Sequence, residues 1–365
     1  MKNRILVIEG QRNIGGGQVM TKKIATALTE RYKVKIFLPS GQSPIADYLN
    51  QFNQWGYHFF SYNRGKKSLK DIIKFIINFF SSYSALRKCV REFTPNVIYV
   101  QSSALLPIAA LIGQRYNISV VSHLHVVHSD NKSKFILNKF LSFSSVKRII
   151  GVSNYTLNQL TPNNRDKSEI LYNCVDTIIK PVNNGVEIKV AVVADIHPDK
   201  GQLILAHAIN KLSNHHITPV FVGNIIDNDY KLKIQKILPN SIFTGYVNNV
   251  IDHIVTFKFV IIPSTTTFET FSLSMVESWV QGIPTIASNL GGPKELVETF
   301  LSSYTDKLLF NKCDADDLAL KIEHLINDAE LYSMVSSEMQ NIAIANFSYE
   351  SFKNKLLNIL SSLLK

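Results

Sequence analysis

Short apolar segments alternate with longer segments of helical character along the whole chain. Parallel strands need a crossover connection, usually a helix, so this alternation predicts parallel sheets built from βαβ units. At 365 residues the chain is long enough for two such domains. The expected strands lie near residues 4–9, 34–38, 97–101, 119–123 and 149–152 in the first half and near 189–194, 219–222, 242–244, 259–262 and 284–287 in the second. The chain is therefore expected to be of the α/β class, with two Rossmann-like domains.

The expected connection between the domains is rich in turn-forming residues and runs from Asn173 to Gly185. We place the first domain at residues 1–178, the second at 179–345 and a final helical segment at 346–365. Open parallel sheets bind ligands at the carboxyl ends of their strands, so a ligand is expected in a central cleft between the domains.

Composition excludes several other classes of protein. Hydrophobic residues make up 45% of the chain, and no window reaches the roughly 18 uninterrupted apolar residues of a membrane span. The apolar run after Arg4 ends at Glu9, so it is expected to form a strand and not a signal peptide. Cys89, Cys174 and Cys313 lie far apart and are odd in number, which argues against a disulfide framework. They also lack the spacing of metal ligands. A cytoplasmic location is expected.

A helix is expected over residues 271–281, after an apolar strand, with Glu269 just before it and Glu277 about two turns inside it. A helix N-terminus holds a diphosphate well, and the backbone at Phe271 and Ser272 is the expected cradle. Beside a phosphate, a carboxylate is useful where it accepts hydrogen bonds from hydroxyl groups, such as those of a sugar and a ribose. The pattern therefore indicates a site for a sugar nucleotide. The alternative is one exposed helical glutamate and one loop glutamate.

A glycine-rich loop follows the first expected strand. Gly15, Gly16 and Gly17 carry no side chains that would keep backbone amides away from a phosphate, and the helix after them adds its positive end. Gly16 and Gly17 are therefore candidate donor-binding residues. The spacing is not Gly-x-Gly-x-x-Gly, and no suitable acidic residue follows for a ribose, so dinucleotide binding is not expected. A flexible turn is the alternative.

The fourth expected strand leads into His123, His125 and His128. Strand alternation places His123 and His125 on one face, as a metal-binding pair would require, but only Asp130 is available nearby as a further ligand. We therefore expect no metal. A neutral imidazole can instead hold a sugar hydroxyl by a hydrogen bond, and a buried core histidine is the alternative.

Charge is distributed unevenly along the chain. Residues 1–180 carry 25 Lys or Arg against 9 Asp or Glu, net +16, whereas the remainder carries 14 against 19, net −5. Residues 66–80 combine helically spaced apolar residues with lysines, which favours an anionic membrane surface as a partner; an ordinary surface helix is the alternative. These lysines are Lys66, Lys67, Lys70 and Lys74. Nucleic acid is not an expected partner, because no recognition motif or aromatic–basic interleaving is present.

A fixed order of motifs runs through the second half. The motifs are Pro263-Ser264, Glu269, Glu277, Gly282-Ile283-Pro284 and Gly291-Gly292-Pro293-Lys294-Glu295. Together they resemble the C-terminal signature of family 4 of the retaining GT-B glycosyltransferases. The resemblance implies the GT-B fold, in which two Rossmann-like domains face a central cleft. It also implies that the final helix, from about Tyr349 to Leu364, crosses back onto the first domain.

The resemblance implies roles for single residues. Glu269 is expected to hold hydroxyls of the sugar, Glu277 the ribose diol, and Lys200 the donor diphosphate. The glycine loop is expected where donor diphosphate and acceptor meet. His125, with His123 as the second choice, is expected near the transferred sugar.

One position departs from the family pattern. Asp195 stands where the family has an arginine on the donor diphosphate, and a carboxylate there would repel it. Either Asp195 turns away and Arg12 or another cation compensates, or donor binding is weak or altered.

The implied activity is transfer of a hexose-type sugar from a nucleoside diphosphate sugar to an acceptor hydroxyl, with retained anomeric configuration and no cofactor. The expected catalytic residues are His125, Glu269 and Lys200. The expected acceptor is a glycan, foremost a lipid-linked oligosaccharide of bacterial surface polysaccharide biosynthesis (lipopolysaccharide or capsule), at the cytoplasmic face of the inner membrane. A catalytically inactive glycosyltransferase-like partner, favoured by Asp195, and a GT-B sugar-nucleotide epimerase are the alternatives.

Overall fold

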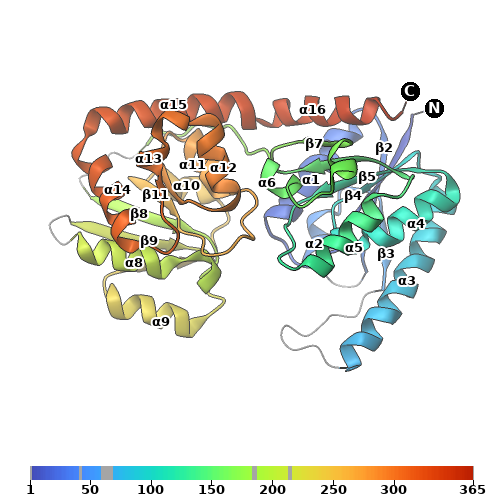
Figure 1. Cartoon of the computed structure of the whole chain (residues 1–365), viewed down its shortest axis with the longest axis horizontal. Helices are drawn as coiled ribbons and strands as arrows, with labels where there is room; N and C mark the ends of the chain where they lie inside the picture. The colour runs from blue at the N-terminus through green and yellow to red at the C-terminus, as the bar shows by residue number, and fades with distance from the viewer. Residues whose placement is uncertain (1, 41–42, 59–68, 183–186, 213–215, 365) are drawn as a thin grey trace. The chain divides into compact units, whose positions relative to one another are not determined.

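The computed structural model describes residues 2–40, 43–58, 69–182, 187–212 and 216–364. They form two α/β units, each built around one parallel sheet (Figure 1). Unit 1 comprises Met1–Tyr172 and Lys353–Lys365, and unit 2 comprises Asn173–Phe352.

The sheet of unit 1 has seven strands in the described residues, in the order β3-β2-β1-β4-β5-β6-β7. All neighbouring strands are parallel. Their bounds are β1 Arg4–Ile8, β2 Lys33–Pro39, β3 Gln54–Tyr57, β4 Val97–Val100, β5 Ser119–Leu124, β6 Val146–Gly151 and β7 Ser168–Ile170. The central strands are buried on both faces, as expected for a sheet covered by crossover helices.

Helices connect these strands. They are α1 Gly16–Thr29, α2 Pro44–Tyr48, α3 Leu69–Phe93, α4 Leu106–Tyr116, preceded by the 3-10 turn η1 Ser103–Leu105, α5 Asn131–Leu141, α6 Asn154–Leu157 and α7 Pro162–Arg165. One apolar cluster joins α3, α4 and α5 to the sheet, through residues such as Val90, Ile112 and Leu141. These three helices therefore cover the same face.

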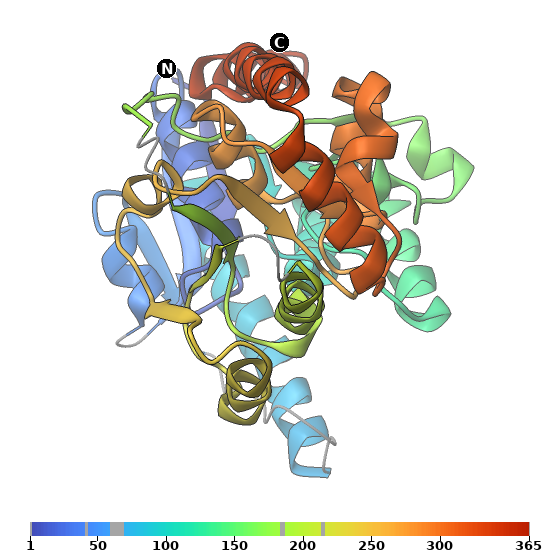
Figure 2. The same ribbon diagram turned by 90° about the vertical axis from the view of Figure 1, so that its left-hand side faces the viewer.

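The sheet of unit 2 has six strands in the described residues, in the order β10-β9-β8-β11-β12-β13. Their bounds are β8 Ile188–Val193, β9 Ile217–Val222, β10 Ile242–Gly245, β11 Phe259–Ile262, β12 Thr285–Ser288 and β13 Leu309–Phe310. The helices are α8 Gln202–Lys211, α9 Asn228–Ile237, α10 Val250–Ile254, α11 Leu273–Val280, α12 Gly291–Phe300, α13 Thr305–Leu308, α14 Ala315–Asn327 and α15 Ala329–Phe347, with 3-10 turns η2 Pro198–Lys200 and η3 Ser302–Tyr304. Figure 2 looks onto this unit and shows α8 and α9 side by side.

The core of unit 2 is fixed by two aromatic residues. Trp279 of α11 is fully buried, and its indole N–H donates to Thr285 Oγ1 of β12 over 2.7 Å. Phe347 at the end of α15 lies against the rings of Trp279 and Phe271. A buried indole with a satisfied N–H fixes α11 firmly on the sheet.

The boundary between the units lies at residues 172/173, earlier than the predicted 178/179. Val175 pairs with Ser348, and Gln281 binds both the carbonyl of Ile178 and the N–H of Lys180. These bonds attach residues 173–180 to unit 2. Residues 183–186 of the predicted connection lie outside the described residues.

The final helix begins at Tyr349 and passes to unit 1 as expected, but the predicted start of the final segment at residue 346 is too early. Residues 346 and 347 still belong to α15, and the last helix, α16, spans Tyr349–Ser361. From Lys353 onward the chain belongs to unit 1, where Lys353 pairs with Glu30 over 3.0 Å and Asn3 Nδ2 donates to the carbonyl of Leu364.

The segment predicted as an amphipathic helix over residues 66–80 begins as a helix at Leu69 and continues to Phe93. Lys66 and Lys67 lie outside the described residues. Among the helices of the described ranges, none has the length and apolar character needed to cross a membrane.

Candidate active site

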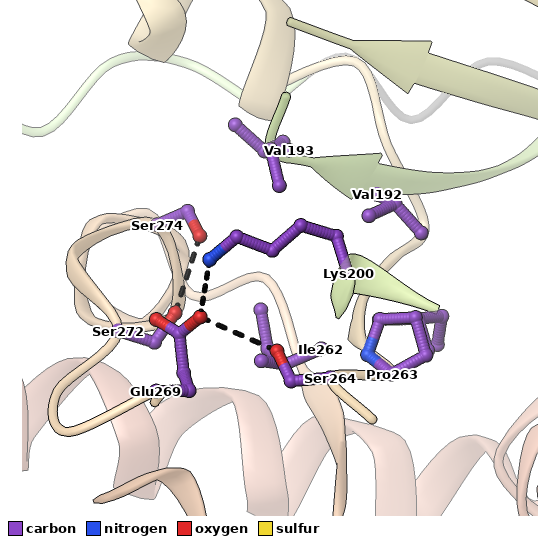
Figure 3. Close-up of a pocket in the computed structure, with 11 residues that line it drawn as sticks. Val192, Val193, Lys200, Ile262, Pro263, Ser264, Glu269, Ser272 and Ser274 are labelled. Carbon is purple, nitrogen blue, oxygen red and sulfur yellow. Dashed lines mark hydrogen bonds and ion pairs between the residues drawn. The ribbon is translucent and has the colours of Figure 1, made fainter. Parts of the chain in front are cut away.

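Unit 2 carries a pocket at the carboxyl ends of its two central strands, β8 and β11 (Figure 3). The ends of the strands supply apolar walls, including Val192 and Ile262. The polar lining consists of Lys200, Ser264, Glu269, Ser272 and Ser274. This edge of a parallel sheet is where ligands bind in folds of this class.

Lys200 and Glu269 meet in this pocket. Lys200 Nζ donates to Glu269 Oε2 over 2.5 Å, and Ser264 Oγ donates to the same oxygen over 3.3 Å. The Glu269 side chain is 14% exposed and that of Lys200 36%. The free hollow beside them is about 30 Å³, room for a water molecule or two. An anion that enters this pocket must therefore compete with Glu269 for Lys200.

The backbone that positions Lys200 requires a glycine at residue 201. Gly201 has φ +70°, and a Cβ there would lie 1.9 Å from the carbonyl oxygen of Pro263. Only glycine tolerates this approach in the left-handed region. The contact holds the turn of Lys200 directly against the end of β11.

A second glycine positions Glu269. The N–H of Gly292, in the first turn of α12, donates to the carbonyl of Glu269 over 2.8 Å. A Cβ on Gly292 would lie 2.1 Å from the carbonyl oxygen of Thr270. The double glycine of the sequence motif therefore packs against the loop that carries Glu269.

Helix α11 begins two residues later than predicted, at Leu273 and not near Phe271. Ser272 is the N-cap, and its Oγ accepts from the N–H of Met275 over 3.4 Å. A serine with extended backbone satisfies one of the first N–H groups and so fixes the start of a helix. In the described part of the chain, the N–H groups of Leu273 and Ser274 have no hydrogen-bond partner. They follow directly on Phe271 and Ser272, the residues of the expected cradle, and belong to the first turn of α11.

Glu277 lies nearer the start of α11 than the sequence interpretation has it, and the side chain of Phe271 points into the core. Glu277 is half-buried and just over one turn into α11, not two, and it does not line the pocket. The Phe271 ring is buried against Phe347, with ring centroids 5.9 Å apart. The Phe271 side chain is thus part of the core.

The carboxylate of Asp195 is tied to a neighbouring loop. Its Oδ1 accepts from the N–H of Asn224 over 3.2 Å and from Asn224 Nδ2 over 3.1 Å. Asp195 does not line the pocket. Asp195 therefore turns away from the pocket, which is one part of the first possibility left by the sequence; Arg12, named there as a compensating cation, is not among the residues that line the pocket.

In unit 1 the glycine loop leads into α1, which begins at Gly16 with Gly15 as its N-cap. The buried carboxylate of Glu9, directly after β1, fixes this loop through hydrogen bonds. Glu9 accepts from the N–H groups of Gly10 and Gln11 over 2.8 and 2.9 Å, and from Thr21 Oγ1 over 2.7 Å. Among the described residues, no neighbouring atom lies within 4 Å of a Cβ placed on Gly17, so space is left beside the backbone at the start of α1.

His125 follows β5 and is half-buried. Its Nε2 is hydrogen-bonded to Gln101 Oε1, and its ring centroid lies 4.2 Å from that of His123. His123 is fully buried and bonds Tyr99 through Nδ1 over 2.9 Å. Burial lowers the pKa of His125 from 6.5 to about 4, so its imidazole is neutral near pH 7.

Two family models match the chain in sequence order. The model described as Glycosyltransferase Family 4 matches residues 14–178, and the one described as Glycosyl transferases group 1 matches residues 187–328. The chain belongs to this glycosyltransferase family. With two parallel-sheet units, it has the GT-B fold expected from its motifs.

Similar proteins include two curated relatives of this glycosyltransferase. An uncharacterized glycosyltransferase of Methanocaldococcus jannaschii is 27% identical over 67% of this chain and 68% of its own length. The poly(ribitol-phosphate) alpha-N-acetylglucosaminyltransferase of Staphylococcus aureus is 29% identical over 38% of this chain and 28% of its own length. A solved structure, Anabaena HepE in complex with UDP and glucose, superposes with a TM-score of 0.80 at 19% identity and covers 98% of this chain and 99% of its own.

The sequence interpretation of this glycosyltransferase missed Glu9, Gln101 and Ser264 as residues that hold site residues in place. Each is a polar residue at or just beyond the end of a buried strand, which was the available signal. Lys200 and Glu269 share one pocket of unit 2, whereas Gly16, Gly17 and His125 belong to unit 1. Across the described ranges, no cluster of three His, Cys, Asp or Glu side chains could hold a metal ion.

Proposed function

We propose that this glycosyltransferase moves a hexose-type sugar from a nucleoside diphosphate sugar to a hydroxyl group of a glycan or lipid-linked acceptor, with retention of anomeric configuration. The observation that carries the proposal is the polar pocket of unit 2, where Lys200 and Glu269 pair beside the N-terminus of α11. It combines a cation, an acceptor for hydroxyl hydrogens and backbone N–H groups, which are what a sugar diphosphate requires.

In this proposal the donor diphosphate takes Lys200 from Glu269. Its oxygens then accept from Lys200 Nζ and from the N–H groups of Leu273 and Ser274. The released Glu269 carboxylate accepts from hydroxyl groups of the sugar, and Ser264 remains bonded to it. Glu277 holds the ribose diol. The hydrogen bonds from Lys200 and the backbone N–H groups stabilise the diphosphate most when negative charge develops on it as it leaves.

The proposed transfer breaks the bond between the anomeric carbon and the diphosphate oxygen and forms a bond from that carbon to the acceptor oxygen. The acceptor hydroxyl proton passes to a leaving phosphate oxygen, so the products are the glycoside and the nucleoside diphosphate. His125 binds a hydroxyl of the transferred sugar through its neutral ring. Retention is supported by the family resemblance. No metal or other cofactor has a part in the step.

The donor class is supported by the similar proteins. HepE is seen with UDP and glucose, and the Staphylococcus relative is named for transfer of N-acetylglucosamine to poly(ribitol phosphate). Both point to hexose-type sugars, and the name of the Staphylococcus relative also points to a polymeric acceptor. A lipid-linked oligosaccharide of surface polysaccharide biosynthesis, such as lipopolysaccharide or capsule, is the proposed acceptor, at the cytoplasmic face of the membrane.

A membrane-facing role is supported by α3. Its exposed large apolar residues recur at helical spacing: Ile73, Ile76, Ile77 and Phe80. The same stripe continues into Arg87 and Arg91, both exposed. Apolar and basic residues on one helix face fit an anionic lipid surface.

A catalytically inactive partner protein is the second candidate. Lys200 is the sole cation that lines the pocket among the described residues, because Asp195 stands where the family has an arginine. A single lysine supplies a weaker clamp for a diphosphate than a lysine and an arginine together.

The test is a panel of UDP-, GDP- and dTDP-sugars, assayed by titration calorimetry and by nucleotide release on wild type and on Glu277→Ala. One donor should bind, and the variant should lose it. Glu298→Ala, which removes an exposed carboxylate from α12 of the same unit, is the matched control and should bind normally. Failure to bind any donor would favour the inactive partner, and turnover of donor without acceptor to an isomeric sugar nucleotide would favour an epimerase. The anomeric configuration of the product, read by NMR, decides retention.

A further inference from the structure

A row of polar side chains crosses the carboxyl edge of the sheet of unit 1, on one face. The register pairs Val7 with Tyr99 and Tyr99 with Val121. Because side chains alternate between the faces of a sheet, Glu9, Gln101 and His123 continue these positions on the same face, followed by His125. Glu9 is used by the glycine loop and His123 by Tyr99. Gln101 and His125 are bonded to each other.

Gln101 is held rigidly at this edge. Its side chain is 7% exposed, and its backbone N–H donates to the carbonyl of Ile8 over 3.0 Å. Its Oε1 atom faces His125 Nε2, and its Nε2 atom is buried without a hydrogen-bond partner in the described part of the chain. A buried amide that leaves its donor unpaired is costly for stability. The contact with His125 is therefore the hydrogen bond that this amide makes among the described residues.

The orientation of this amide decides the chemical form of His125. An Oε1 atom can only accept, so the ring carries its hydrogen on Nε2 and a lone pair on Nδ1. With the amide turned by 180°, the NH₂ group would donate to Nε2 and the hydrogen would lie on Nδ1. Because burial lowers the pKa of His125 to about 4, the ring is neutral and has only these two forms near pH 7.

We infer that Gln101 is a positioning residue for His125: its Oε1 atom fixes the imidazole in the form with the hydrogen on Nε2, and so sets the form in which the ring meets a sugar hydroxyl. The step from tautomer to catalysis rests on the proposed transfer reaction. The contact itself does not.

Imidazole ¹⁵N NMR of the full-length protein tests the inference directly, since protonated and unprotonated ring nitrogens have clearly different shifts. The His125 signal is assigned as the one that His125→Ala lacks. In wild type we expect the hydrogen on Nε2. Wild-type His125 with its hydrogen on Nδ1 would overturn the inference without any variant.

Variants of Gln101 provide the second measurement. Gln101→Met keeps the size of the side chain and removes the acceptor, so the tautomers of His125 should become mixed. Gln101→Glu still accepts from Nε2 and should restore the Nε2–H form, while its charge raises the pKa of His125. Gln281→Met, which replaces a buried glutamine of unit 2, is the matched control and should leave the His125 signal unchanged. An unaltered tautomer in Gln101→Met would refute the positioning role.

Kinetics separate this inference from the proposed function. With the donor found in the panel, Gln101→Met should lower kcat roughly ten- to a hundredfold, the equivalent of one buried hydrogen bond, with donor KM nearly unchanged. A shifted tautomer with unchanged kcat would end the catalytic part of the inference. If the wild type turns over no donor, but Gln101→Met still changes the tautomer of His125, the proposed function is refuted and the role of the Gln101–His125 contact stands.

Discussion

Lys200 and Glu269 form the ion pair that any anionic ligand of the pocket must open. Because Lys200 is the one lysine among the described lining residues, its loss removes the charge-assisted bond to the donor diphosphate. Such bonds contribute about 1.5–3 kcal/mol, so Lys200→Ala should lower kcat/KM roughly ten- to 150-fold. Steady-state kinetics with the donor from the panel measure this.

The control for Lys200 is Lys211→Ala. Lys211 belongs to the same unit and also pairs with a carboxylate, Asp316, but at an exposed position on α8. Exposed pairs contribute little, so this variant should keep its kcat/KM. Equal losses in the two variants would remove the special role of Lys200.

His125 provides a prediction about pH. Its folded pKa of about 4 lies below the ordinary value of 6.5, so the unfolded chain binds more protons than the folded protein between these values. The stability linked to the neutral ring is therefore complete above pH 6.5 and is lost as the pH falls toward 4. Thermal unfolding of wild type and His125→Asn should show the wild type losing stability faster over this window. If the stability of the wild type instead rises relative to that of the variant as the pH falls, the low pKa of His125 is contradicted.

At the scale of elements, two glycines with nearly the same φ allow the cost of backbone strain to be measured apart from the cost of a steric clash. Gly201 and Gly245 have φ +70° and +71°, but only Gly201 lies against another backbone, at Pro263. Gly245→Ala should cost about 1 kcal/mol, the ordinary penalty of the left-handed region. Gly201→Ala adds a clash with a carbonyl oxygen and should cost at least about 2 kcal/mol more while displacing Lys200. Chemical denaturation gives both values, and similar costs would show that the turn yields easily.

The sequence predicts elements well where burial dictates their composition. Strands such as β4 and β11 are uninterrupted apolar runs and were located, whereas β3, β7 and β13 were missed. These three lie at sheet edges, are short, and pair on one side only, so little in their composition marks them. β6 begins at Val146 and not near residue 149. Lys147 and Arg148 are polar and not buried, so the first half of the strand lacks the apolar pattern that the prediction relied on.

The same reasoning explains which site residues could be predicted. Lys200 and Glu269 belong to local motifs with glycines at fixed spacing, which a sequence displays. The bonds from Gln101 to His125 and from Ser264 to Glu269 depend on which strand ends lie side by side and on where loops return. The start of α11 was misjudged because Ser272, taken as part of the helix, caps it through its hydroxyl.

At the scale of the whole molecule, the basic first half and the acidic second half predict that only one of them contacts an anionic membrane. The exposed stripe of α3 ends in a basic cluster, Arg87, Lys88 and Arg91. Replacing all three by glutamine should weaken binding to vesicles that contain anionic lipid roughly hundredfold at low salt, from about 1 kcal/mol for each charge. The matched variant removes the three lysines of α9, Lys231, Lys233 and Lys236, and should bind like wild type. Because attraction between exposed charges is screened, the difference should shrink as salt rises; equal losses in both variants, or binding indifferent to salt, would mean that α3 is an ordinary surface helix.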